Sequence, residues 1–364
     1  MTDGLPRKRI VGYADRMSAR PGEAIRFMAS CEDVPSYRAD LVRLISGDHH
    51  PDGCGFIERV VPSVLGTTHR GRRQIIHAGS FATIDDPAPF AALTSFTLQA
   101  MIWPTIRLPV RPQSILGSYS KERRAGFALM IHKGSATLRI GNGTQVASVR
   151  SGVPLPDRVW TFVAASFDAA TRTARIIQAT MPSHARAPEP IEREAHFEIE
   201  PAPSHTPFSI AADIVRTRSG RIASRHNFNG KIDRPRVANR ALDHAEMEEI
   251  KGAGPYPPHV VAAWDFALDM TTDRVHDRSA NRLEGRLVNM PTRAMKGWTW
   301  TGEEMNWTHA PEQYGAIHFH DDDLYDAGWQ TDFSFDIPDD LPSGVYAARL
   351  APVLAPSPGG GGGG

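Results

Sequence analysis

The stretch FNGKIDRPRVANRALDHAEMEEI, residues 228–250, changes from a strand-like pattern to a helix-like pattern within one segment. In its first half, Ile232 and Val237 stand among turn formers and charges, which predicts a short strand bent at Pro235. Proline lacks the amide hydrogen that a central strand donates, so such a strand is tolerated only at a sheet edge or at a bulge.

The second half of this stretch carries the signals of a helix start. Asp243 is a favourable N-cap residue, and Glu246 occupies the reciprocal position of a capping box. We therefore interpret the stretch as the segment that closes a β-sandwich. In that interpretation Asp233 and Arg234 tie turns together and take no part in chemistry.

Length and composition limit the remaining alternatives. A chain of 364 residues exceeds the usual size of one core, which predicts two domains. Lys plus Arg equals Asp plus Glu at 41 each, so the net charge gives no attraction to nucleic acid or to an anionic membrane. The start of the chain lacks the apolar run of a secretory signal, and no apolar stretch is long enough to span a bilayer, so we expect a cytoplasmic protein.

Two cysteines are too few for a disulfide framework or a thiolate metal site. Cys31 lies in phase with the apolar residues of AIRFMASC, residues 24–31, which predicts a buried small hydrophobic side chain.

Apolar residues recur with period two along nearly the whole chain, and no long amphipathic helix or solenoid repeat is visible. Strand patterns near both ends have too few local partners to bury a core, which predicts one discontinuous immunoglobulin-like sandwich of residues 8–65 and 296–350. Residues 70–292 are then an inserted second β-sandwich. Residues 351–364, APVLAPSPGGGGGG, have the composition of a flexible tail.

Three segments resemble successive signatures of laminin-G-like, concanavalin-A-like jelly rolls: SFTLQAMIWP (95–104), VWTFVAASFDAATRTARI (159–176) and FNGKIDRPRVANRALDHAEM (228–247). The whole chain, including HAPEQYGAIHFHDDDLYDAGWQTDFSFDIPDDLPSGVYAARL (309–350), is similar to the N-terminal, non-catalytic half of the large subunit of the N,N-dimethylformamidase family. The expected fold is all-β, with a jelly-roll sandwich inserted into a small immunoglobulin-like sandwich.

The resemblance also implies a function. In that family, tyrosines and a glutamate of a C-terminal domain hold iron, which polarises the formamide carbonyl and activates water. The parent reaction converts N,N-dimethylformamide to dimethylamine and formate. No residue of this chain matches those ligands, so the resemblance implies a scaffold with no catalytic residue and no cofactor of its own. Its implied partners are the catalytic domain and a small subunit in an oligomer, with no nucleic acid or membrane.

One cluster has residue types that could hold a metal ion. In HFHDDD, residues 318–323, His318 and His320 share one strand face and Asp321 follows them. The alternative, which the lack of a third ligand cluster favours, is a strand end that enters an acidic turn.

A second cluster is aromatic. Trp298, Trp300 and Trp307 lie within ten residues of a loop, where dense aromatic side chains either hold two domains together or face a partner. We expect domain contacts, with a partner interface as the alternative.

Two functions of other classes remain open from the sequence. One is a free-standing, lectin-like carbohydrate-binding module, because jelly rolls serve sugar binding as well as scaffolding. The other is a self-sufficient enzyme that uses residues 318–323. Paired carboxylates such as Glu198 and Glu200 have glycosidase spacing, but they lie in a segment rich in Pro, Glu and Arg that is typical of a solvated surface.

Overall fold

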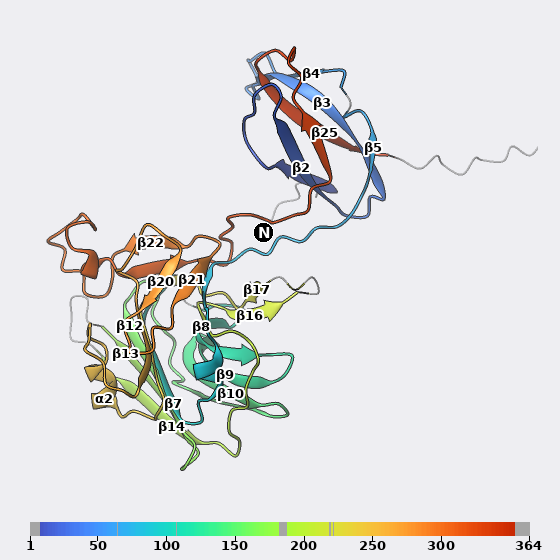
Figure 1. Ribbon diagram of the computed structural model, residues 1–364. Coiled ribbons are helices and arrows are strands. Elements are labelled where there is room, and N and C mark those ends of the chain that lie inside the picture. Colours follow the sequence, from blue (N-terminus) through green and yellow to red (C-terminus); the bar gives the residue numbers. More distant parts are fainter. Residues whose placement is uncertain are drawn as a thin grey trace, which may run out of the picture. The chain divides into compact units, whose positions relative to one another are not determined.

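The computed structural model describes residues 8–353 except 64, 107, 182–187, 218, 219 and 221. It divides into two compact units, one of residues up to Ile76 and from Ala327 onward, the other of His77–Asp326 (Figure 1). Both are built almost entirely of strands. The prediction of an all-β chain with a jelly-roll sandwich inserted into a smaller sandwich is confirmed.

The smaller unit is a sandwich of two antiparallel sheets whose strands come from both ends of the chain. The three-stranded sheet has the order β1-β2-β24, and the four-stranded sheet has β25-β3-β4 with β5 also on β3. The strands are β1 (Ile10–Ala14), β2 (Ala24–Cys31), β3 (Ser36–Gly47), β4 (Phe56–Val60), β5 (Thr68–Arg70), β24 (Phe333–Asp336) and β25 (Val345–Pro352).

Period-two alternation in these strands produces the core of the smaller unit. Tyr37 and Leu41 of β3 pack against Phe333 and Phe335 of β24. Cys31 belongs to the same core, as its phase predicted, and burial raises the pKa of its thiol. A thiol held protonated in this way is unreactive.

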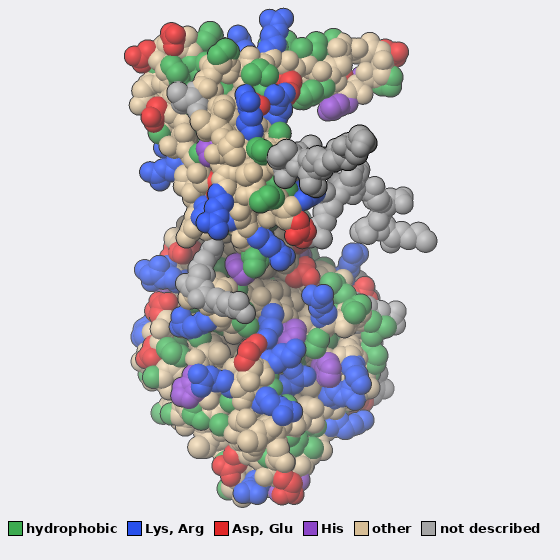
Figure 2. Space-filling model, turned by 90° about the vertical axis from the view of Figure 1, so that its right-hand side faces the viewer, with side chains coloured by type: hydrophobic (Ala, Val, Ile, Leu, Met, Phe, Trp, Pro, Cys, Tyr) green, Lys and Arg blue, Asp and Glu red, His purple; other side chains and the backbone are tan. Residues whose placement is uncertain are grey.

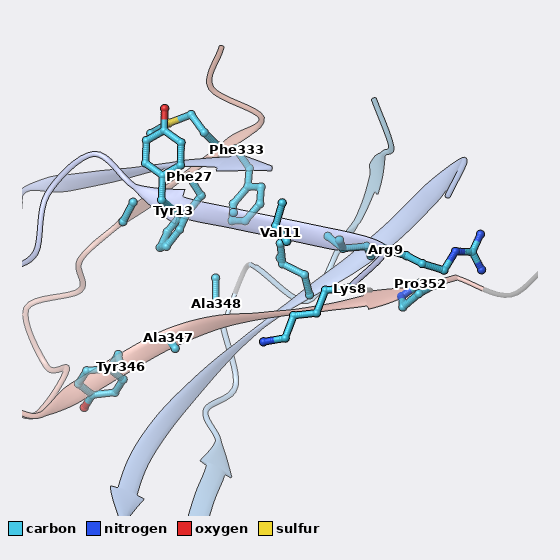
Figure 3. Close-up of a pocket in the computed structure, with 15 residues that line it drawn as sticks. Lys8, Arg9, Val11, Tyr13, Phe27, Phe333, Tyr346, Ala347, Ala348 and Pro352 are labelled. Carbon is cyan, nitrogen blue, oxygen red and sulfur yellow. The ribbon is translucent and has the colours of Figure 1, made fainter. Parts of the chain in front are cut away.

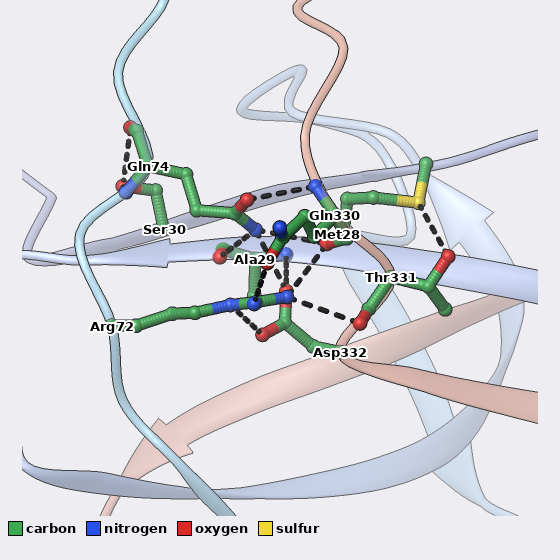
Figure 4. A network of polar contacts seen from close by, with 8 residues as sticks. All are labelled: Met28, Ala29, Ser30, Arg72, Gln74, Gln330, Thr331 and Asp332. Atoms are coloured by element: carbon green, nitrogen blue, oxygen red, sulfur yellow. Dashed lines mark hydrogen bonds and ion pairs between the residues drawn. The ribbon is translucent and has the colours of Figure 1, made fainter. Parts of the chain in front are cut away.

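The segments that leave and re-enter the smaller unit are clasped to each other (Figure 4). The Arg72 guanidinium donates to the Asp332 carboxylate at 2.8 Å and to the carbonyls of Gln330 and Thr331 at 2.9 and 3.0 Å. Gln74 and Gln330 exchange two further bonds, at 3.0 and 2.8 Å. These contacts close the unit where the insertion begins and ends.

The larger unit contains one long antiparallel sheet with the order β11-β10-β9-β8-β15-β6-β21-β20-β19-β18-β7-β12-β13-β14. The sheet folds over, so that β10 and β11 pack across from β13 and β14 (Figure 1). Its strands are β6 (Phe81–Ile84), β7 (Phe96–Pro104), β8 (Gln113–Ser120), β9 (Ala125–His132), β10 (Ser135–Asn142), β11 (Val146–Arg150), β12 (Thr161–Asp168), β13 (Thr173–Thr180), β14 (Ile191–His196), β15 (Ser209–Ile210), β18 (Gly230–Ala238), β19 (Val260–Asp265), β20 (Arg274–Asp277) and β21 (Gly285–Val288).

The remaining elements of the larger unit are short. They are the hairpin β16 (Asp213–Arg216) and β17 (Ile222–Arg225), the strands β22 (Thr292–Met295) and β23 (Ala316–Phe319), and the helices α1 (Ala88–Ala91), α2 (His244–Glu249) and η1 (Pro311–Gln313). None of the helices among the described residues is long and apolar enough to cross a membrane.

The core of the larger unit lies between the two layers of its sheet. Phe96 and Ile102 of β7 face Phe127 of β9 there, beside Trp264. A second apolar cluster covers the outer face, where Met247 of α2 packs on Phe162 of β12. The sheet is therefore buried on both faces over much of its area, as the apolar character of both faces of β7 indicates.

Residues 228–250 close this sandwich as the sequence predicts. β18 lies inside the sheet between β7 and β19, and its register shifts between Asp233 and Arg236, where Pro235 sits in a bulge. The bulge alternative is thus correct and the edge alternative is wrong. Asp243 and Glu246 form the predicted capping box of α2.

Two predicted boundaries need correction. Residues 296–326 belong to the larger unit, because β23 pairs with β18 and β22 and η1 leads into it. Ala351 and Pro352 belong to β25, where they pair with Arg38 and Tyr37, and not to the predicted tail. Residues 354–364 of that tail lie outside the described residues.

Candidate functional site

Of the predicted metal ligands, His318 of β23 lies on the outer face of the larger unit, beside the strands β18 and β7. β7, β18 and β23 turn Ile102, Ile232 and Ile317 into the core between the layers. Because side chains alternate along a strand, the paired residues Trp103, Lys231 and His318 point outward side by side.

This row of side chains is partly shielded from water. The Lys231 ammonium lies 4.4 Å from the ring centre of Trp103, and burial lowers its pKa. Burial, with the neighbouring His320 and Lys231, lowers the pKa of His318 to about 4. The imidazole of His318 is therefore neutral near pH 7, and its Nε2 is buried without a hydrogen-bond partner.

The other two predicted ligands point to different partners. His320 Nδ1 lies 3.3 Å from the Asp323 carboxylate, to which the Ser80 hydroxyl also donates at 2.6 Å. Asp321 donates its backbone amide to the side-chain oxygen of Asn229 at 3.1 Å. Among the described residues, no three His, Cys, Asp or Glu side chains are grouped so as to hold a metal ion.

Asp321 instead lines a cleft of about 770 Å³ at the end of β8, β17 and β18. The walls include the amides of Gln113 and Asn229 and the imidazole of His226. Apolar side chains of the loop before β8, among them Leu108 and Val110, complete the rim. Figure 2 shows Lys, Arg and His side chains gathered on the face of the larger unit that carries the hairpin β16–β17.

His226 is held in place by a buried carboxylate. Its Nδ1 lies 2.8 Å from Asp213 Oδ2, and Asp213 is only 3% exposed. The backbone of His226 has a φ of 54°, in the left-handed region that non-glycine residues seldom adopt.

The cations around the cleft differ in whether they are paired. The Arg225 guanidinium donates two hydrogen bonds to the Glu122 carboxylate, at 2.6 and 3.1 Å, and this interaction lowers the pKa of Glu122. Arg111 and Lys121 line the same cleft and form no ion pair with the described residues. No periodic signal in the sequence marks this group of residues, because they come together only through strand ends and turns.

Asp233 and Arg234 have the structural role predicted for them. Asp233 is buried, its pKa is raised by that burial, and its carboxylate accepts the backbone amide of Trp298 at 3.2 Å. Arg234 donates to the carbonyl of Lys251 at 3.3 Å.

The three predicted interface tryptophans are all in the larger unit. Trp298 packs on the outer apolar cluster beneath α2. Trp300 stacks on the Lys296 ammonium at 3.7 Å and donates its indole N–H to the carbonyl of Glu304. Trp307 is partly exposed. Domain contacts of this loop, with a partner interface as the alternative, stay a prediction.

The smaller unit has an open groove of about 770 Å³ between its two sheets (Figure 3). β1 and β25 border it, and neither strand has a second neighbour among the described strands. Phe27 and Phe333 form its floor, Val11 and Tyr346 its sides, and Lys8 and Arg9 one end, as Figure 3 shows. A groove with apolar walls and unpaired strand edges is suited to protein contacts.

Sequence comparison adds two curated relatives that match along nearly the whole chain. The relative from Paracoccus aminophilus is 35% identical over 360 residues, and the one from an Alcaligenes species is 33% identical over 359. Each match covers 94% of this chain and 47% of the relative. The relatives are N,N-dimethylformamidase beta subunits. The chain thus spans about half the length of the dimethylformamidase subunits that it matches.

A family model described as "N,N-dimethylformamidase beta subunit-like, C-terminal" matches residues 292–360. Among solved structures, the CBM40 domain of the Ruminococcus gnavus IT-sialidase is 19% identical, covering 49% of this chain and 96% of that domain, with a TM-score of 0.37. A structural match at this level supports no argument on function.

Iron, which the resemblance to the dimethylformamidase family implies, does not fit the side chains of the described residues. The two histidine rings of the predicted cluster lie 4.1 Å apart, but His320 is turned to Asp323 and Asp321 faces the cleft. A stable site would need three or more donors directed at one point.

Proposed function

We propose that this chain is the N-terminal scaffold region of the large subunit of an iron-dependent, N,N-dimethylformamidase-like amidohydrolase. This large subunit corresponds to the beta subunit of the relatives. One observation carries the proposal. Similarity to the dimethylformamidase beta subunits extends through both units of this chain, while the matched part is 47% of each relative. In this view the chain supports the active site and assembly, and other residues carry the chemistry.

The chemistry of the reaction supports the proposal that the catalytic residues lie outside this chain. A formamide carbonyl is a poor electrophile, so water attacks it near neutral pH only with a strong Lewis acid or a well-placed nucleophile, acid and base. Of the polar side chains of residues 318–323, His320 is paired with Asp323, which also accepts from Ser80, so the side chains do not converge on one point. We therefore assign the iron to residues that this chain does not contain.

The proposed partners are the catalytic domain and a small subunit within an oligomer. The name of the relatives, beta subunit, refers to an enzyme with more than one kind of subunit. The groove between β1 and β25 is the surface that we assign to a partner, because its apolar walls stay exposed in the isolated unit.

The test is to purify the chain, incubate it with ferrous or ferric iron, and measure bound metal and dimethylamine release together. We expect no turnover of N,N-dimethylformamide. Stoichiometric iron with turnover that disappears in His318→Ala or His320→Ala would overturn the scaffold proposal and make this chain the catalyst. Glu198→Ala, in a solvated segment remote in sequence, is the matched control.

A further inference from the structure

We propose that the cleft lined by Gln113, His226, Asn229 and Asp321 binds a small polyhydroxylated carboxylate, that is, a sugar acid. This inference is independent of the scaffold function, since it concerns binding and not turnover. The volume of the cleft, about 770 Å³, lies within the usual range of small-molecule sites.

Two buried amides in the cleft are left with unused donors. Gln113 and Asn229 are 4% and 7% exposed. The Gln113 side-chain oxygen accepts the backbone amide of Asn229 at 3.4 Å, and the Asn229 oxygen accepts that of Asp321 at 3.1 Å. These bonds fix which end of each side chain is oxygen.

The NH₂ groups of both amides therefore point away from these partners, and neither donates a hydrogen bond to a described residue. Neither nitrogen is sealed from solvent, because neither is among the fully buried unpaired atoms. Water reaches both donors in the free chain, and a ligand would replace it. Ligand oxygens in the cleft would satisfy both donors.

The charged groups indicate what else the ligand carries. Arg111, two residues before Gln113, lines the cleft without an ion pair among the described residues, and so favours a carboxylate. Lys121 follows the other end of β8, about 25 Å along the strand from Gln113, and lies beyond the reach of the same small ligand. Arg225 cannot serve in this way, because Glu122 already holds it. The unpaired carboxylate of Asp321 accepts only from donors such as hydroxyl groups.

His226 adds an oriented ring to the same wall. Asp213 engages Nδ1, which leaves Nε2 as the ring nitrogen available to a ligand. The exposed apolar side chains of Leu108 and Val110 offer contact to the ligand's carbon skeleton. Hydroxyl groups, a carboxylate and a compact carbon frame together describe a sugar acid better than a simple anion or a neutral sugar.

The test uses the full chain and three probes: D-glucuronate, D-glucose as the neutral counterpart, and sulfate as a simple anion. Calorimetric titration should show glucuronate binding with a Kd of about 1 mM, at least about ten-fold tighter than either of the other probes. Absence of glucuronate binding at about 10 mM would overturn the proposal. Equal binding of sulfate and glucuronate would also overturn it, since the site would then recognise charge alone.

Variants of residues that line the cleft test whether glucuronate binds there. Asn229→Asp keeps the oxygen that holds Asp321 but replaces the NH₂ donor with a repelling carboxylate, so we expect at least about ten-fold weaker glucuronate binding. If that buried change disturbs folding, the exposed variant Arg111→Ala should give a similar loss. Arg150→Ala, an exposed cation on β11, is the control and should leave the Kd unchanged. Wild-type affinity in Arg111→Ala would place the ligand elsewhere and contradict the proposal.

Discussion

Arg236 is a buried cation that binds backbone carbonyls instead of a carboxylate. It is 1% exposed, and its guanidinium donates to the carbonyls of Trp264 at 2.7 Å and of Ile250 and Gly252 at 3.3 Å each. The hydroxyl of Tyr256 is a further partner at 2.8 Å. Of these carbonyls, that of Ile250, the C-cap residue of α2, is one that the helix leaves without an internal partner.

Replacing this arginine should be among the most destabilising single changes in the larger unit. Arg236→Met preserves much of the volume but leaves several buried carbonyls unpaired, so we expect a loss of about 3 kcal/mol in the free energy of unfolding. Urea denaturation of the wild type and the variant measures this loss of unfolding free energy. Arg240→Met, which removes an exposed ion pair with Glu246, should cost less than about 1 kcal/mol. Equal losses in both variants would contradict the role given to Arg236.

His318 makes stability depend on pH in a defined window. Its pKa is about 4 in the folded chain and 6.5 as an ordinary imidazole, so the unfolded chain takes up the proton first as the pH falls. Stability from this group is complete above pH 6.5 and is lost between pH 6.5 and about 4.

The variant His318→Gln should therefore flatten the stability profile between these pH values by about 1 kcal/mol, a figure reduced for solvent screening at the sheet surface. Chemical denaturation at a series of pH values measures this profile. His196→Gln, at an exposed strand end, is the control and should follow the wild-type curve. An unchanged slope in His318→Gln would contradict the burial of this ring.

At the scale of elements, the capping box of α2 can be tested by itself. Asp243 accepts the amide of Glu246 at 2.9 Å, and Glu246 accepts the amide of Asp243 at 3.0 Å. Asp243→Ala should cost about 1 kcal/mol in the free energy of unfolding, whereas Asp243→Asn keeps an acceptor and should cost much less. Neither variant should change binding of glucuronate. Lost binding without a change in melting temperature would make this segment a site and not a closure.

Element identities were largely predictable where the signal is local. The cap at Asp243 and the bend at Pro235 depend on neighbouring residues, and both occur in the structure. The position of β18 inside the sheet was not predictable, because strand order depends on pairing partners such as β7, far away in the chain. Arg236 shows the same limit, since a charged residue in a strand pattern suggests exposure, while its carbonyl partners come from two other segments, residues 250–252 and Trp264.

At the scale of the whole molecule, strand pairing joins residues from the two ends of the chain. Residues 24–27 of β2 pair with β24, and β3 pairs with the whole of β25. Early and late strands without local partners predicted such pairing, because each set alone is too small to bury a core. The boundary at residue 296 was misplaced because β23 is short and its partner, β18, cannot be identified from its own residues.

The discontinuous smaller unit should fold without the insertion. Joining residue 76 to residue 327 through a short Gly-Ser linker keeps both sheets and the clasp between Arg72 and Asp332, so we expect a β-rich circular dichroism spectrum and cooperative unfolding. Arg72→Ala in this shortened chain should lower the free energy of unfolding by about 2 kcal/mol, because it leaves the buried carboxylate of Asp332 without its cation. Arg59→Ala, an exposed change on β4, should alter it by less than about 0.5 kcal/mol. Independent folding of a fragment of residues 8–76 would show that the late strands are dispensable and would contradict the shared core, in which Phe333 and Phe335 pack on Tyr37 and Leu41.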